Sequence, residues 1–199
     1  MKPRTPDEIL KSATRLFAKA GKDGVTMSQI ADLAGVNKAA LFYYFRNKDH
    51  LYRIVLKSSL LHFLGTFESE VLKQAHQKQA QLPTIITEIF FEYFRRHPEF
   101  IQLLLWELAA NGKVILELLQ QFSQSKKFSH LYNTIAILWN ISSQNQDDQT
   151  GKLEFVRFLG TIFAYPLLHP LMEFIFDLDE HRREKLLDAY VKQINQPGA

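Results

Sequence analysis

The stretch that decides the fold is VNKAALFYYFRNKDHLY, residues 36–52. Four aromatic residues follow one another in it, from Phe42 to Phe45. Successive residues of an α-helix are rotated by about 100° around its axis, so four in succession point in nearly all directions. Only part of this set can face a core, and the remainder is available to a surface.

The residues before this run predict a helix-turn-helix. Thr26 followed three residues later by Gln29 is a capping-box pattern, which marks the start of a helix. Gly35 is placed to end that helix in a left-handed conformation, and Asn37 is a good N-cap for a second helix through Phe45. The inward positions expected on the first of these helices are Ile30, Leu33 and Ala34.

The second helix is expected to have two different faces. Leu41 and Phe45 can face the core, with Phe42 partly buried beside them. The opposite face presents small residues, tyrosines and a lysine, which are suited to close approach and to bonds with phosphates and base edges. Its members are Lys38, Ala39, Ala40, Tyr43 and Tyr44. The alternative is that the two tyrosines pack under a neighbouring helix.

The distribution of charge favours a polyanionic partner for this part of the chain. Residues 1–57 hold 11 Lys and Arg against 5 Asp and Glu, whereas residues 58–199 hold 13 against 16. A basic head on a slightly acidic body is typical of nucleic-acid binding, although many soluble domains vary this much. Lys48, just after the second helix, either contacts a phosphate backbone or is an ordinary exposed lysine.

Residues 6–53 resemble the N-terminal DNA-binding domain of TetR-type (tetracycline-repressor-like) transcriptional regulators. The resemblance rests on ATRLFAKAGKDGVTMSQIADLAGV, on Lys38 and on LFYYFRNKDHL. It implies a three-helix DNA-binding domain, residues 1–48, on a larger helical domain, residues 49–199, that dimerises and binds a small molecule. It also implies DNA contacts from Thr26, Lys38, Ala39, Tyr43, Tyr44 and Lys48. Ala39 and Tyr44 differ from the Gly and His that are frequent in the family, which leaves the operator sequence open.

The rest of the chain is also expected to be helical, so the predicted fold class is all-α. The expected helices cover residues 6–20, 49–79, 83–96, 98–110, 113–122, 128–139, 152–176 and 178–194. We expect bends at Pro166 and Pro170 and a cap-like start of the last helix at Asp177. The longest uncharged run, residues 158–172, is too short for a membrane span of about 20 residues.

The central helices are rich in aromatic residues. They either line an apolar ligand cavity or form ordinary core packing, and the resemblance implies that this domain has a cavity. The candidate ligand-binding residues are Phe63, Phe94, Phe100, Trp106, Tyr132 and Trp139. Glu107 lies among apolar neighbours and is either a solvent-facing acid, which we favour, or a partner for a cationic ligand.

The two late helices are the candidate dimer interface, because each has an apolar stripe and two from each subunit would form a four-helix bundle. The stripe residues are Phe155, Phe158, Leu159, Ile162, Phe163, Leu186, Leu187, Tyr190 and Ile194. A single helix-turn-helix makes few base contacts, so pairing on a palindromic operator is expected.

The sequence therefore predicts a cytoplasmic, homodimeric repressor that binds double-stranded DNA and is released by a small hydrophobic or aromatic effector. The alternative is a DNA-binding interaction or architectural protein without an effector. No nucleophile motif, Gly-rich phosphate loop or pair of histidines at metal-ligand spacing is present, and Cys is absent. We therefore expect neither an enzyme nor a metal or cofactor.

Overall fold

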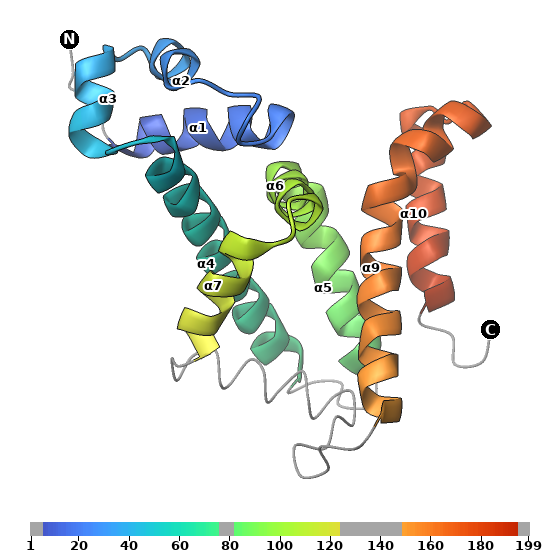
Figure 1. Ribbon diagram of the computed structural model, residues 1–199. Helices are drawn as coiled ribbons and strands as arrows, with labels where there is room; N and C mark the ends of the chain where they lie inside the picture. The colour runs from blue at the N-terminus through green and yellow to red at the C-terminus, as the bar shows by residue number, and fades with distance from the viewer. Residues whose placement is uncertain (1–5, 76–81, 124–148, 195–199) are drawn as a thin grey trace. The chain divides into compact units, whose positions relative to one another are not determined.

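In the computed structural model, the described residues, 6–75, 82–123 and 149–194, form α-helices joined by short turns (Figure 1). No strand occurs among them, which confirms the all-α fold class. The helices are α1 (Pro6–Ala20), α2 (Met27–Ala34), α3 (Lys38–Tyr44), α4 (Lys48–Ala75), α5 (Leu82–Arg96), α6 (Pro98–Ala109), α7 (Lys113–Ser123), α9 (Gln149–Phe176) and α10 (Glu180–Ile194). The helix expected at residues 128–139 lies outside the described residues.

The chain divides into two compact units. The first consists of residues 1–65 and 96–124, and the second of residues 66–95 and 125–199. The boundary predicted after residue 48 separates the DNA-binding part of the chain from the part expected to bind an effector, and it stays a prediction. By packing, the N-terminal helices belong to one unit with the first part of α4 and with α6 and α7. None of the described helices has the length and hydropathy needed to cross a lipid bilayer.

The helix-turn-helix forms as its sequence predicts. The backbone N–H of Gln29 donates to the Thr26 hydroxyl at 3.2 Å, and the Gln29 side chain accepts from the Thr26 backbone N–H at 2.8 Å. Gly35 adopts a φ of 62° and ends α2. The Asn37 side chain then accepts from the Ala40 N–H at 2.7 Å and starts α3. Phe45 is already extended, so α3 is one residue shorter than expected.

Helices α1, α2 and α3 form the N-terminal head of the chain. The core of this head differs from the prediction at two residues. Ile30, Ala34, Leu41 and Phe45 are buried as expected. Leu33 is instead 50% exposed, because Ile30, Ala31 and Ala34 occupy the arc of α2 that is buried and Leu33 falls outside it. Phe42, expected to be partly buried, is 44% exposed. Both side chains therefore add to the apolar surface of the head.

Trp106 on α6 connects the head to the rest of the first unit. Its indole N–H donates to the backbone oxygen of Ala18 at 3.0 Å, near the end of α1. Gly21, which ends α1 with a φ of 68°, lies against the ring: a Cβ there would lie 3.1 Å from the Trp106 Cδ2 atom. Gly21 is therefore needed for both its backbone conformation and this close approach.

Glu107 is buried rather than solvent-facing, which corrects the interpretation favoured from the sequence. Only 4% of the residue is exposed. One carboxylate oxygen accepts from the Tyr52 hydroxyl of α4 at 3.1 Å, and the other accepts from the Val114 N–H, in the first turn of α7, at 2.7 Å. A single side chain on α6 therefore links α4 and α7. These two bonds make the burial of Glu107 possible, because a buried carboxylate needs hydrogen-bond donors to replace the water that it has lost.

Tyr52 extends this connection to the head. Its ring meets the ring of Phe17 on α1 edge to face, with centroids 5.1 Å apart. Burial, and then the neighbouring Glu107 carboxylate, raise the pKa of the Tyr52 phenol well above its usual value. The phenol therefore stays protonated and remains a donor to Glu107 across the physiological pH range.

In the second unit, Phe91 of α5 packs against Tyr165 of α9 and Tyr190 of α10. The Tyr190 hydroxyl also donates to the backbone oxygen of Thr161 at 2.6 Å. Helix α9 begins three residues earlier than expected and continues past both of its prolines, so neither ends it.

The start of α10 differs from the prediction. Its N-terminal cap is Asp179, whose carboxylate accepts from the Arg182 N–H at 2.8 Å. That hydrogen bond lowers the pKa of Asp179. Asp177 adopts a positive φ of 48° after the end of α9 and makes the turn between the helices instead.

The hydrogen bond from Tyr52 to Glu107 provides a test of this packing. Tyr52→Phe leaves a buried carboxylate oxygen without its donor, and we expect a loss of about 1–3 kcal/mol in the free energy of unfolding. Urea unfolding followed by circular dichroism measures it. The control is Tyr43→Phe, the same change at an exposed phenol, which should alter stability by less than about 0.5 kcal/mol. Equal, small effects of both changes would contradict the role given to this bond.

Candidate nucleic-acid interface

The outer face of α3 is open to solvent. Lys38 and Ala39, in its first turn, are exposed, and Tyr43 is 83% exposed. Tyr44 is 41% exposed, and its ring meets that of Tyr43 edge to face with centroids 5.1 Å apart. The two tyrosines therefore do not pack under another described helix, as the alternative interpretation of the sequence required.

This face has the chemistry needed to contact DNA. Ala39 adds little bulk, so the start of the helix can approach a groove closely. The phenols can donate to phosphate oxygens, and the ammonium of Lys38 can contact a phosphate or a guanine edge. Asn37 and Leu41 hold α3 from the other side, one as a cap and one in the core, so this face needs no support from its own side chains.

Thr26 is exposed at the start of α2, but its hydroxyl already takes part in the capping box. It donates to the Gln29 side-chain oxygen at 2.9 Å while accepting from the Gln29 N–H. The predicted phosphate contact would have to replace the bond that the hydroxyl donates. The side-chain amide nitrogen of Gln29 is a neighbouring donor that the sequence analysis did not consider.

Lys48, at the start of α4, is partly committed to contacts within the head. Its ammonium donates to the backbone oxygen of Val25 at 3.2 Å and lies 3.9 Å from an oxygen of Asp23. Its side chain is 31% exposed, so one side remains accessible to a phosphate. Arg46, directly after α3, is exposed and adds a cation that the sequence analysis missed. Its position beside the aromatic run was the available signal.

The predicted ligand-binding residues that the structure describes do not all belong to the same compact unit. Phe63 and Phe100 stack in the first unit with ring centroids 5.0 Å apart. Phe94 lies in the second unit, packed against Phe90 and Phe163. Trp106 contacts α1 as described above, and Tyr132 and Trp139 lie outside the described residues.

The predicted dimer residues fall into three groups. The side chains of Phe155, Phe158, Leu159 and Ile194 lie outside the described residues. Ile162 is fully buried within the second unit, and Phe163 and Tyr190 contribute to its aromatic packing. Leu186 and Leu187 are half-buried on α10.

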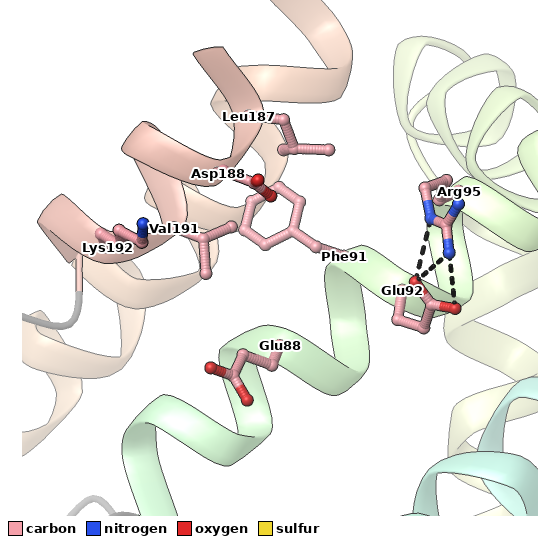
Figure 2. Close-up of a pocket in the computed structure, with 8 residues that line it drawn as sticks. All are labelled: Glu88, Phe91, Glu92, Arg95, Leu187, Asp188, Val191 and Lys192. Carbon is pink, nitrogen blue, oxygen red and sulfur yellow. Dashed lines mark hydrogen bonds and ion pairs between the residues drawn. The ribbon is translucent and has the colours of Figure 1, made fainter. Parts of the chain in front are cut away.

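A groove of about 400 Å³ lies between α5 and α10 in the second unit. Figure 2 shows Phe91 pointing from α5 toward Leu187 and Val191 of α10. The rest of the lining is charged: Glu88, Glu92, Arg95, Asp188 and Lys192. Arg95 forms an ion pair with Glu92 at 2.7 Å. This groove does not match the mostly apolar cavity expected from the sequence.

The chain is similar in sequence to known bacterial regulators. Residues 9–55 match the family described as bacterial regulatory proteins, tetR family. The HTH-type transcriptional repressor NicS of Pseudomonas putida is 36% identical over 109 residues, which cover 55% of this chain and 50% of NicS. The HTH-type transcriptional regulator RutR of Escherichia coli is 33% identical over 111 residues, with the same coverage. The chain thus spans about half the length of these relatives.

Solved structures share the fold over nearly the whole chain. The fatty acid degradation regulator FadR from Bacillus halodurans superposes with a TM-score of 0.65 at 17% identity, covering 99% of this chain and 98% of that one. FadR from Bacillus subtilis superposes with a TM-score of 0.57 at 15% identity, covering 98% and 100%. Residues 9–55 thus match the tetR family of bacterial regulatory proteins, in agreement with the helix-turn-helix described above, and the chain as a whole shares the fold of the two solved regulators.

Proposed function

We propose that this regulator is a homodimeric repressor that binds a palindromic DNA operator and is released by a small apolar effector. The observation that supports DNA binding most directly is the exposed face of α3. Tyr43 is 83% exposed although it is a large aromatic residue, and among the described residues its ring contacts that of the neighbouring Tyr44. An exposed tyrosine pair beside Lys38 is suited to a phosphate backbone and the groove next to it.

The basic head supplies the electrostatic part of this binding. Lys38 and Arg46 are exposed at the two ends of α3, so they can neutralise phosphates on either side of the groove. Lys48 follows at the start of α4. Because its ammonium is already bound to Val25, we assign it a phosphate contact that is the same for every sequence and no role in base recognition.

Substitutions on α3 test the DNA-binding face. Tyr43→Ala and Lys38→Ala should each weaken operator binding by about 1–3 kcal/mol without unfolding the protein, because both side chains are exposed. Fluorescence anisotropy with DNA from the region around the protein's own gene measures the affinity. Lys57→Ala, an exposed lysine on α4, is the control and should bind as the unaltered protein does. If the α3 variants also match the unaltered protein, α3 is not the recognition helix.

Dimerisation is supported by an exposed apolar stripe on α9. Leu171 lies four residues after Leu167, and Phe174 and Ile175 follow three and four residues after Leu171. Each of the four is more than half exposed, Phe174 by 86%. A stripe of this kind on a monomer marks an interaction surface. We propose that a second copy of the chain covers it and that α9 and α10 of both subunits form a four-helix bundle. The interface then uses this stripe rather than Ile162, which has no exposed surface.

A charge placed in the stripe should separate the subunits. Phe174→Glu and Leu171→Glu would each bury a carboxylate without a partner in the interface, so we expect monomers at micromolar concentration. Multi-angle light scattering measures the mass. Leu72→Glu places the same charge at an exposed leucine of α4 and should remain dimeric. An unaltered protein that is already monomeric, or a dimer in all three variants, would refute this interface.

The proposal of an apolar effector rests on the aromatic content of the second unit. Phe67, Phe90 and Phe94 lie in ring contact there, and each is less than a tenth exposed. The Bacillus subtilis regulator FadR, which shares the fold, was solved in complex with stearoyl-CoA. A site among such side chains would favour a molecule with a long apolar or aromatic part, since polar groups would be left unpaired.

Helix α4 offers a path from effector to DNA. Three residues separate it from α3, and its residues contribute to both compact units. An effector that displaces its second half would change how the paired heads meet half-sites about 34–36 Å apart. It can do so only by binding the DNA-incompetent state more tightly.

A screen of fatty acids, acyl-CoA thioesters and aromatic acids against the operator complex tests the effector. An effector should lower operator affinity by about 5–150-fold, the usual range of allosteric coupling. Operator release is followed by anisotropy. For comparison, the Tyr43→Ala variant shows how much operator affinity is lost when only a DNA contact is removed. If no compound releases the operator while DNA binding is intact, the chain is a DNA-binding interaction or architectural protein without an effector.

Two further proposals rest on the similarity in sequence to known regulators. The relatives in sequence are regulators, so we propose that this chain has no enzymatic activity. A regulator of bacterial genes acts where the DNA is, so we propose a cytoplasmic location.

A further inference from the structure

A cavity of about 520 Å³ lies in the first unit, beside the contacts that hold α1 against α6. One wall is the turn that follows α1, residues 20–24. Another is the corner between α6 and α7, with Trp106, Glu107, Lys113 and Val114, and Tyr52 of α4 completes the lining. Its walls are polar and aromatic, so it differs in chemistry from the apolar effector site proposed above.

Glu107 makes this cavity unusual. Its carboxylate is almost fully buried, and its two hydrogen bonds come from neutral donors, the Tyr52 hydroxyl and the Val114 N–H. Among the residues that the structure describes, no cation lies within ion-pair distance of it. Lys22, which also lines the cavity, is bound to Asp49 at 3.0 Å. A buried anion without a direct counter-ion is costly, and a bound cation would compensate its charge.

Aromatic rings stand beside this carboxylate. The indole of Trp106 is 45% exposed although its N–H is held by Ala18, so part of the ring is accessible. The ring of Tyr52 already has one ammonium near it, that of Lys22, 6.0 Å from its centroid. Electron-rich ring faces next to a carboxylate attract an organic cation more than an anion or a neutral molecule.

The cations at the rim do not reverse this preference. The charge of Lys22 is offset by Asp49. Lys113 is exposed on the first turn of α7, and the strongly exposed Asp23 lies on the opposite wall. Charges open to water are screened far more than a buried one, so the field inside the cavity follows Glu107.

We propose that this cavity binds a small organic cation with an aromatic ring, its ammonium directed at Glu107 and its ring against Trp106. Such a ligand touches both the turn after α1 and the α6–α7 corner. It would therefore add to the contacts between the DNA-binding head and α6. The site is independent of the proposed apolar effector, and its occupancy can be measured without DNA.

The probe is 2-phenylethylammonium, and 2-phenylethanol is its neutral match with the same ring and nearly the same length. Trp139→Phe leaves Trp106 as the sole tryptophan, and the phenyl ring of the probe does not absorb light that excites tryptophan. At constant ionic strength, we expect a saturable change of Trp106 fluorescence with the ammonium and an affinity at least about tenfold lower for the alcohol.

Two further variants identify the site. Glu107→Gln keeps the shape and an acceptor oxygen but removes the charge, so the ammonium should bind at least about tenfold more weakly and the alcohol as before. Ala110→Phe fills the cavity from an exposed position and should abolish binding of both compounds. Glu99→Gln, the same change elsewhere on α6, should leave binding unaltered. Circular dichroism checks that each variant is folded.

The proposal is overturned by any of three results: no saturable signal with the ammonium, equal affinity for the alcohol, or unchanged ammonium binding in folded Glu107→Gln. If Glu107→Gln does not fold, Ala110→Phe decides whether the cavity is the site, and the comparison of ammonium with alcohol decides its charge preference. Unaltered ammonium binding in Ala110→Phe would place the ligand elsewhere and refute the proposal. None of these readouts depends on operator release, so a failed effector screen leaves them unaffected.

Discussion

The buried carboxylate of Glu107 is the interaction on which the packing of the first unit depends. It lies on α6 but accepts its hydrogen bonds from Tyr52 on α4 and from Val114 at the start of α7. Tyr52 in turn packs against Phe17 of α1. Because a buried charge is stable only while its donors stay in place, these bonds restrict how the four helices can shift relative to one another. Trp106, one residue away, adds the direct bond to α1.

This arrangement has a consequence for regulation. Two specific contacts between α1 and α6 lie beside the proposed cation site: the hydrogen bond from the Trp106 indole to Ala18, and the close approach of Gly21 to the same ring. A ligand beside these contacts would shift the position of α1 against α6 only if it bound one arrangement more tightly than another. The outer face of α3 takes no part in them. Its tyrosines stay exposed while the inner side, with Leu41, holds the helix in place.

The second unit shows that apolar residues of one helix can have different environments. Ile162 and Tyr190 were expected at a dimer interface, but they pack within the unit, where Tyr190 also donates to the Thr161 backbone. Leu171 and Phe174 are left exposed on α9. Helix α9 has apolar residues on nearly every side, so periodicity could not tell which side packs against α5 and which side is left exposed.

The sequence alone determined the local structure of the head. The capping box at Thr26, the left-handed Gly35 and the cap at Asn37 act between residues a few positions apart, so their patterns are legible without the fold. Tertiary structure decided the environment of Glu107. Its donor Tyr52 is 55 positions away in the chain, and no local pattern shows whether an isolated acid on an apolar helix meets water or a buried hydroxyl. Contacts between distant segments set burial, and burial set the role of that side chain.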